Sequence, residues 1–205
     1  MFRAIAVVAA ILLVVGGVFA AKFVVSGTGR YQFAIELELD GTRYSGATVW
    51  EMSIRATPEL LPNSATPEIK VIGDAIDIPL QEGKTLFILK RDYLSPPNSA
   101  FGRKYLICLP GDIQEDAKLI ATFEGSCDIG VHPKLVIADK NGVLEEIFYD
   151  GSNGHRVTII STVATGTRDP ITRGIINRHP WIAALPSDRQ NSSRIPFYTE
   201  DFSRR

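Results

Sequence analysis

The side chains best suited to chemistry in this sequence are three histidines and two cysteines. His132, His155 and His179 could supply metal ligands or a general base. None of them lies four residues from another histidine or beside a cysteine, which are spacings typical of a shared metal site. His132 and His179 each precede a proline, and that position favours extended or loop backbone. The spacing therefore favours three separate loop histidines, and no metal site is predicted.

The carboxylates form no obvious acid–base pair. Glu145 and Glu146 are adjacent, so on a strand they point to opposite faces. Glu36 and Glu38 share a face, where we expect them to solvate the outside of a sheet. The chain has no G-x-S-x-G nucleophile elbow and no P-loop, and the SGTG stretch at 26–29 lacks the third glycine of a dinucleotide-binding turn. We therefore predict no catalytic residue and no cofactor, which favours a protein that is not an enzyme.

The two cysteines are Cys108 and Cys127. An even pair in an exported protein suggests a disulfide, and two buried free thiols remain the alternative. A nucleophilic Cys127 would need a nearby base, and nothing in the sequence places His132 on its sulfur.

The apolar N-terminus is the strongest signal in the chain. Ala4–Ala21 contains no charged or polar side chain, and Phe23–Val25 extend the run beyond Lys22. About 20 apolar residues span a bilayer core, so residues 1–25 are predicted to form an uncleaved membrane anchor. A secretory signal peptide with its cleavage site at Val18–Phe19–Ala20 is the alternative.

These alternatives predict different locations. The anchor predicts a single-pass protein of the inner (cytoplasmic) membrane that contacts the lipid bilayer through this segment, with its body facing the periplasm. Cleavage predicts a secreted protein. Arg3 on one side and Lys22 and Arg30 on the other make the positive-inside rule a poor guide to orientation. The formal net charge is -1, which gives no electrostatic reason to expect nucleic-acid binding.

Alternating apolar residues predict that the body is built from antiparallel strands. The inward positions of the first strand are Phe33, Ile35, Leu37 and Leu39. Those of its return strand are Thr48, Trp50, Met52 and Ile54. Asp40–Gly41 between them predicts a tight hairpin turn. Leu86–Leu89 is apolar on both faces, which predicts a central strand.

Further strands are predicted at 69–73, 75–80, 85–91, 105–110, 135–139, 143–149 and 156–165. Asn141–Gly142 predicts a second hairpin turn. The segment 111–125 instead has helical spacing, with Asp112 as the N-cap, Glu115 at the capping-box distance and Gly125 as a C-terminal cap. It predicts one amphipathic helix.

Together these elements predict a mainly β fold. We expect an antiparallel sandwich or a partly open barrel with one amphipathic helix, preceded by one N-terminal transmembrane or signal helix. Residues 26–185 form the predicted exported domain. Residues 186–205 are polar and are expected to form a loose tail.

The stretch 168–185, RDPITRGIINRHPWIAAL, has two interpretations. Gly174 and Pro180 prevent a long helix, and the apolar residues are too many to remain in water. The first interpretation is a segment that seals the core with Trp181 as its plug. The second is a partner-docking strip, because tryptophan and arginine dominate interface hot spots. The docking residues would be Arg173, Arg178, Trp181 and Ile182.

The layout resembles a family of uncharacterised bacterial envelope proteins. The resemblance lies in the N-terminal apolar segment, the YQFAIELE strand, the SGATVWEMSIR strand and the late DPITRGI…RHPW element, and it covers Arg30–Arg55 and Asp169–Trp181. It implies an envelope location and a β-rich body, and it assigns no activity and no site residue.

Three functions remain open from the sequence. The first is a membrane-anchored envelope protein whose non-catalytic β domain binds a protein or cell-wall partner. The second is an envelope hydrolase with a site built from loops such as 92–104, because catalytic groups can assemble in space without a sequence motif. The third is a purely structural envelope component.

Overall fold

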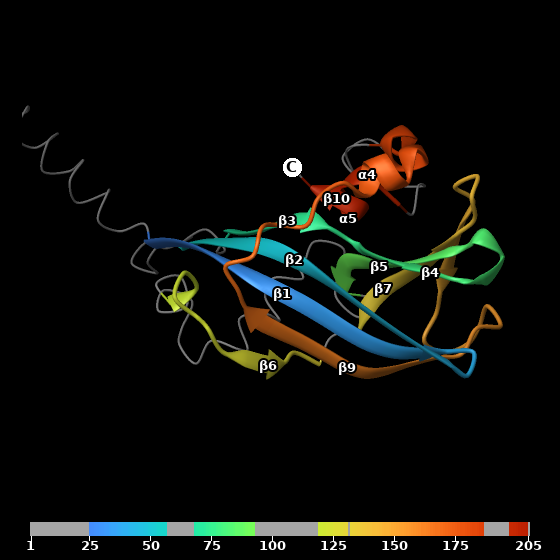
Figure 1. Cartoon of the computed structure of the whole chain (residues 1–205), viewed down its shortest axis with the longest axis horizontal. Coiled ribbons are helices and arrows are strands. Elements are labelled where there is room, and N and C mark those ends of the chain that lie inside the picture. The colour runs from blue at the N-terminus through green and yellow to red at the C-terminus, as the bar shows by residue number, and fades with distance from the viewer. Residues whose placement is uncertain (1–24, 57–67, 93–118, 131, 187–196, 205) are drawn as a thin grey trace, which may run out of the picture.

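The computed structural model describes residues 25–56, 68–92, 119–130, 132–186 and 197–204 (Figure 1). The strands are β1 (Val25–Leu39), β2 (Thr42–Ala56), β3 (Glu68–Asp74), β4 (Ile76–Pro79), β5 (Thr85–Asp92), β6 (Ser126–Asp128), β7 (Pro133–Ala138), β8 (Leu144–Ile147), β9 (Val157–Gly166) and β10 (Ser203–Arg204). The short helices are η1 (Gln81–Gly83), α4 (Ile175–Arg178), η3 (Pro180–Ala184) and α5 (Thr199–Phe202). The predicted mainly β fold is confirmed.

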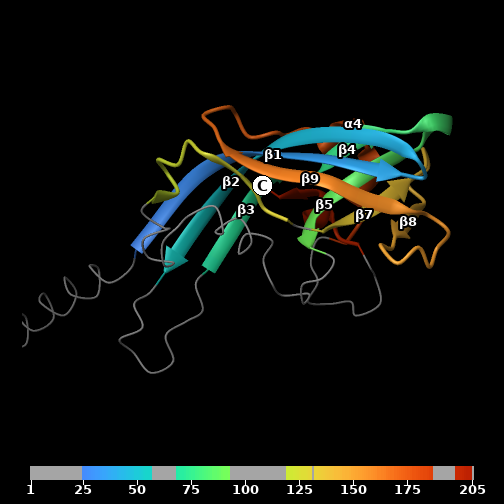
Figure 2. The same cartoon turned by 90° about the horizontal axis from the view of Figure 1, so that it is seen from below.

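The strands form two antiparallel sheets, with orders β10-β3-β2-β1-β9-β6 and β4-β5-β7-β8. Both contribute to one apolar core, which is consistent with the predicted sandwich. Its members include Phe33, Leu37, Trp50 and Ile54 from the first sheet and Ile78, Leu86, Leu135 and Ile147 from the second. Figure 2 shows that β1, β2 and β3 extend beyond the four-stranded sheet at the end where β1 begins.

The β1–β2 hairpin is the longest feature of the fold. Its register runs without a shift from Val25↔Ala56 to Leu39↔Thr42. Asp40 and Gly41 form the turn with φ of 51° and 80°, the left-handed pair that a two-residue hairpin needs. All eight predicted inward residues of the two strands are buried. The hairpin, its turn and its inner face are therefore confirmed.

β9 pairs with the other side of β1 and contains a bulge. Glu36 pairs with Ser161 and Leu37 with Ile159, so Ile160 is an extra residue in the ladder. Ile160 is 42% exposed. A bulge of this kind twists a strand and disturbs its regular hydrogen-bonding pattern.

Between β3 and β4 the chain passes from one sheet to the other within a single residue. β3 pairs with β2, β4 pairs with β5, and Ala75 alone separates β3 from β4. Gly46 of β2 allows this close approach, because a Cβ atom there would lie 2.4 Å from Cγ2 of Ile76.

β5 is the predicted central strand, and the structure confirms it. Leu86 and Ile88 enter the core between the sheets, whereas Phe87 and Leu89 enter a second core on the opposite face. Ile175 of α4, Ile182 of η3 and Phe202 of α5 cover that face. The C-terminal helices thus form a third layer on the four-stranded sheet (Figure 1).

The structure differs from the predicted loose tail over Phe197–Arg204. Phe197, Tyr198 and Phe202 are buried, and β10 pairs with β3. Three aromatic side chains within a short stretch supply enough apolar surface to hold it on the sheet, despite its polar neighbours. Residues 187–196 lie outside the described part of the chain.

The predicted amphipathic helix is wrong over its described C-terminal part. Helical conformation ends at Leu119, Ile120–Thr122 form a turn, and the chain enters β6 at Ser126. The turn is favoured because it lets backbone pack directly on the end of the six-stranded sheet. The predicted caps Asp112 and Glu115 lie outside the described residues.

Two further predictions also fall outside the described residues. They are the strand at 105–110 and the apolar segment up to residue 24. Among the described residues, no helix is both long enough and apolar enough to cross a membrane.

Asp74, the last residue of β3, links the six-stranded sheet to the C-terminal layer. Its carbonyl accepts hydrogen bonds from Trp50 Nε1 at 2.7 Å and Thr48 Oγ1 at 3.1 Å. Its buried carboxylate accepts from the Ile175 backbone N–H and from Ser203 Oγ, each at 2.8 Å. The sheet crossing and the C-terminal layer therefore depend on one residue.

We predict that Asp74→Ala lowers the free energy of unfolding by at least about 3 kcal/mol, because each buried donor left unpaired costs about 1–3 kcal/mol. Urea denaturation of the purified protein measures this loss. Ser203→Ala removes one of the two donors and serves as the control, with an expected loss of about 1 kcal/mol. Equal losses in the two variants would contradict the central role of the carboxylate.

Candidate functional site

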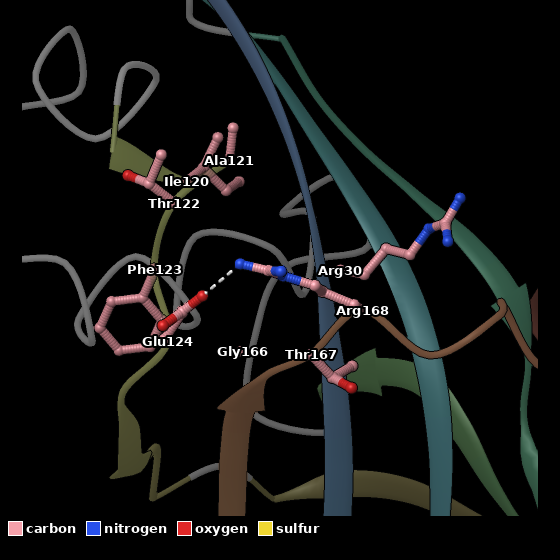
Figure 3. Close-up of a pocket in the computed structure, with 9 residues that line it drawn as sticks. All are labelled: Arg30, Ile120, Ala121, Thr122, Phe123, Glu124, Gly166, Thr167 and Arg168. Carbon is pink, nitrogen blue, oxygen red and sulfur yellow. Dashed lines mark hydrogen bonds and ion pairs between the residues drawn. The ribbon is translucent and has the colours of Figure 1, made fainter.

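The hollow at the β1 end of the six-stranded sheet is the first candidate site; we call it the β1-end hollow (Figure 3). The turn that precedes β6 forms one wall, and β1 with the chain that follows β9 forms the other. The lining residues are Arg30, Ile120, Ala121, Thr122, Phe123, Glu124, Gly166, Thr167 and Arg168.

Two glycines allow the turn to lie on the sheet. A Cβ atom on Gly29 would lie 2.0 Å from the carbonyl oxygen of Ile120, and one on Gly166 would lie 1.9 Å from that of Phe123. The Tyr31 hydroxyl also donates a hydrogen bond to the Ile120 carbonyl at 3.3 Å. Any side chain at either glycine position would push this wall of the hollow away.

An exposed ion pair bridges the hollow. Arg168 Nη2 lies 2.8 Å from Glu124 Oε1, and the two side chains are 93% and 74% exposed. Figure 3 shows the Arg168 side chain extending toward Glu124, whereas the Arg30 guanidinium points away toward β2. Arg30 pairs there with Glu51 at 3.3 Å. Exposed pairs of this kind contribute only about 0–1 kcal/mol, so the Arg168 pair is easily exchanged for another anion.

The hollow has the chemistry of a binding site. The Thr122 hydroxyl donates to the Leu119 carbonyl at 3.1 Å, and Thr167 Oγ1 accepts from the Asp169 N–H at 3.1 Å. Both hydroxyls are thus engaged with neighbouring backbone groups. The exposed guanidinium of Arg168 can bind an anion.

His155 forms a second polar cluster at the opposite end of the β1–β2 hairpin. Its Nδ1 lies 2.7 Å from Asp40 Oδ2, and its Nε2 lies 3.6 Å from Glu145 Oε1. Asp40 Oδ1 also accepts the backbone N–H of Arg156 at 2.8 Å. The Arg156 N–H and the His155 side chain hold the pKa of Asp40 below its ordinary value. The cluster clamps the hairpin turn to β9 and brings it near β8.

His179 belongs to a third cluster. Asp77 accepts hydrogen bonds from Arg178 Nε at 2.8 Å, Arg178 Nη2 at 2.9 Å and His179 Nε2 at 3.0 Å. Burial would raise the pKa of Asp77, but the hydrogen bonds from Arg178 and His179 outweigh burial and hold the pKa below its usual range. This ion pair ties α4 to β4.

The structure packs Trp181 and Ile182 against the fold, whereas Arg173 and Arg178 are exposed. Ile182 is fully buried, and Arg178 is held by Asp77. The half-buried Trp181 ring packs edge-on against Phe87 at 5.6 Å and Phe202 at 5.5 Å between ring centroids. Partner docking at these residues stays a prediction, and the packing that the structure shows is that of a core-sealing segment.

The remaining predicted residues lie apart. His132 packs edge-on against Tyr149, with 5.3 Å between ring centroids. Cys127 carries a disulfide, but Cys108 lies outside the described residues, so their pairing stays a prediction. The predicted loop 92–104 also lies outside the described residues beyond Asp92. Within the described ranges, no three His, Cys, Asp or Glu side chains are placed to hold a metal ion.

The sequence did not indicate the β1-end hollow. Arg168 and Glu124 are 44 residues apart, and nothing local marks Gly29 or Gly166 as points of close packing. The comparisons with known proteins add no site. No protein-family model, no curated protein and no solved structure matches the chain. The resemblance to envelope proteins therefore rests on the segments that carry it in the sequence.

We predict that the Asp40 clamp fails in acid. The pKa of Asp40 is lower in the folded protein than the ordinary value of an aspartate. Its stabilising contribution is therefore fully present above that value and is lost as the pH falls through the folded pKa. Urea denaturation over a pH series should show the wild type more stable than Asp40→Asn near neutral pH, with the difference closing in acid. A difference independent of pH would rule out a contribution from the charge.

We also predict that Trp181→Ala lowers the free energy of unfolding by about 2–3 kcal/mol, less than for a fully buried tryptophan because the ring is half-buried. Thermal melting checks this. Arg173→Ala, an exposed change on the same segment, is the control and should alter stability by less than about 0.5 kcal/mol. Unchanged melting of the Trp181 variant would favour the docking interpretation instead.

Proposed function

We propose that the protein is a membrane-anchored envelope protein whose β domain binds an extended segment of a partner protein along an open sheet edge. The apolar N-terminal segment supports the anchor, and the proposal places the body on the periplasmic side of the membrane. The antiparallel body supports edge recognition, in which main-chain hydrogen bonds supply affinity. The observation that carries the proposal is the outer edge of β2 between Arg43 and Ala47.

The backbone groups of this edge point away from β1. The Val49 N–H donates to Thr172 Oγ1 at 2.8 Å, and the Val49 carbonyl accepts from the Thr172 N–H at 3.0 Å. The backbone N–H and carbonyl of Val49 therefore point away from β1. Because the β1–β2 register has no shift, the residues that alternate with Val49 face the same way. These residues are Ala47, Ser45 and Arg43.

No described strand covers this edge. β3 pairs with β2 only over Glu51–Arg55. The side chains of Arg43, Ser45 and Ala47 are all exposed. Two of the three are small, which leaves room for an added strand and its side chains. The three residues thus present a regular row of donors and acceptors.

The opposite edge of the same sheet is less suited to a partner strand. β6 already covers Val163–Thr165 of β9. The remaining part of the β9 edge contains the bulge at Ile160, and bulges are a common means of blocking edge pairing. This contrast is why we assign recognition to β2.

Ser45→Pro tests the proposal. Proline removes an N–H that points outward and is tolerated on an edge strand, so the domain should remain folded while the partner strand loses a central donor. We expect crosslinked pull-down of the full chain from membranes of the native host to recover a dominant partner with the wild type. Recovery should fall at least several-fold with Ser45→Pro.

Ser45→Thr is the matched control, because it keeps the N–H and suits a strand. It should recover the partner as the wild type does. Thermal melting of both variants checks that the domain stays folded. Equal recovery by a folded Ser45→Pro variant would contradict the edge-recognition proposal. Loss of the partner with Trp181→Ala instead would place recognition on residues 168–185.

A further inference from the structure

The β domain begins where the apolar segment ends. The apolar run reaches Val25, and β1 starts at Val25, so no spacer separates the two. A strand advances about 3.3 Å per residue, which places Gly29 and Arg30 roughly 15 Å along β1 from that point. β9 runs toward this same end, because Tyr31 pairs with Gly166. Arg168 therefore lies at the end of the domain that the anchor enters.

This end combines exposed apolar and basic side chains. Leu119 is 41% exposed on the wall of the turn, one of three large apolar side chains exposed in the described ranges. The exposed basic residues at this end are Arg30, Arg55, Lys70 and Arg168, and its exposed acidic residues are Glu124 and Asp169. Apolar residues beside lysine and arginine are typical of surfaces that contact the bilayer interface.

Within this end, Arg168 is the residue best placed to bind an anion. Its guanidinium has five N–H donors, and its contact with Glu124 is an exposed one. Arginine binds phosphate oxygens through paired N–H groups. Phe123, which is partly exposed, lines the same hollow and adds apolar surface to it. A phosphate group joined to an apolar chain could therefore contact both the Arg168 guanidinium and the apolar side chain beside it.

We infer that the β1-end hollow binds the phosphate of an anionic phospholipid through Arg168, so that this end of the domain rests on the membrane surface. The inference rests on the proposed function, because it needs the N-terminal segment to stay in the bilayer. Binding at this end would leave the β2 edge, near the opposite end of the hairpin, free for a partner.

The experiment uses the full chain inserted into lipid nanodiscs. One set contains phosphatidylcholine alone, and the other also contains phosphatidylglycerol. Hydrogen–deuterium exchange of the peptides covering 119–126 and 166–169 is the readout. We expect exchange there to slow several-fold in the anionic discs, and added salt to reduce the effect because it screens surface charge.

Three variants sharpen the result. Arg168→Gln should abolish the difference between the discs. Glu124→Gln should enlarge it, because the guanidinium loses its competing carboxylate. Arg43→Gln is the matched control, since Arg43 is also an exposed arginine paired with a glutamate, Glu36, but at the far end of the hairpin. It should leave the difference unchanged.

Several outcomes would overturn the inference. If the chain inserts in both discs but exchange is equal, the inference fails while the proposed function stands. The same holds if the difference between the discs persists in Arg168→Gln. Protection by inorganic phosphate in phosphatidylcholine discs, with no effect of phosphatidylglycerol, would indicate a site for a soluble phosphate instead. A chain that inserts in neither disc would overturn the anchor in the proposed function, and this inference with it.

Discussion

The burial of one carboxylate, that of Asp74, is the constraint on which the attachment of the C-terminal layer depends. A charged group can leave water only where donors replace its hydration, and this one finds them on Ile175 and Ser203. The carbonyl of the same residue anchors the Trp50 indole of the first core. The β3–β4 crossing between the sheets is therefore also the point to which α4 and β10 are fastened.

That arrangement explains how a domain with short helices can hold a second core. α4, η3 and α5 span four or five residues each, too few to be stable as isolated helices. They persist because their apolar residues cover Phe87 and Leu89 of a strand that is already apolar on both faces. The Asp77–Arg178 pair then fixes α4 against β4. These three helices are held by packing and directed hydrogen bonds rather than by helix propensity.

The sequence predicted those parts of the fold that depend on neighbouring residues. Alternation from Phe33 to Leu39 and the Asp40–Gly41 pair were sufficient for the hairpin, because period and turn chemistry are local. The turn after Leu119 and the packed C-terminus were not predicted, since both depend on residues distant in the chain. The β1-end hollow was missed for the same reason: Gly29 and Gly166 are recognisable as packing points only once Ile120 and Phe123 lie against them.

The pairing of β1 with β9 and of β3 with β10 also affects how the chain can fold. The β1–β2 hairpin is local and can form early. The other side of β1 must wait more than a hundred residues for β9, and β3 must wait for Ser203–Arg204. Long-range pairings of this kind slow folding because loop closure comes before the contacts that reward it. During synthesis, strand edges of β1 and β3 would therefore stay unpaired until β9 and β10 have been made, which makes that interval the time of greatest risk of misassembly.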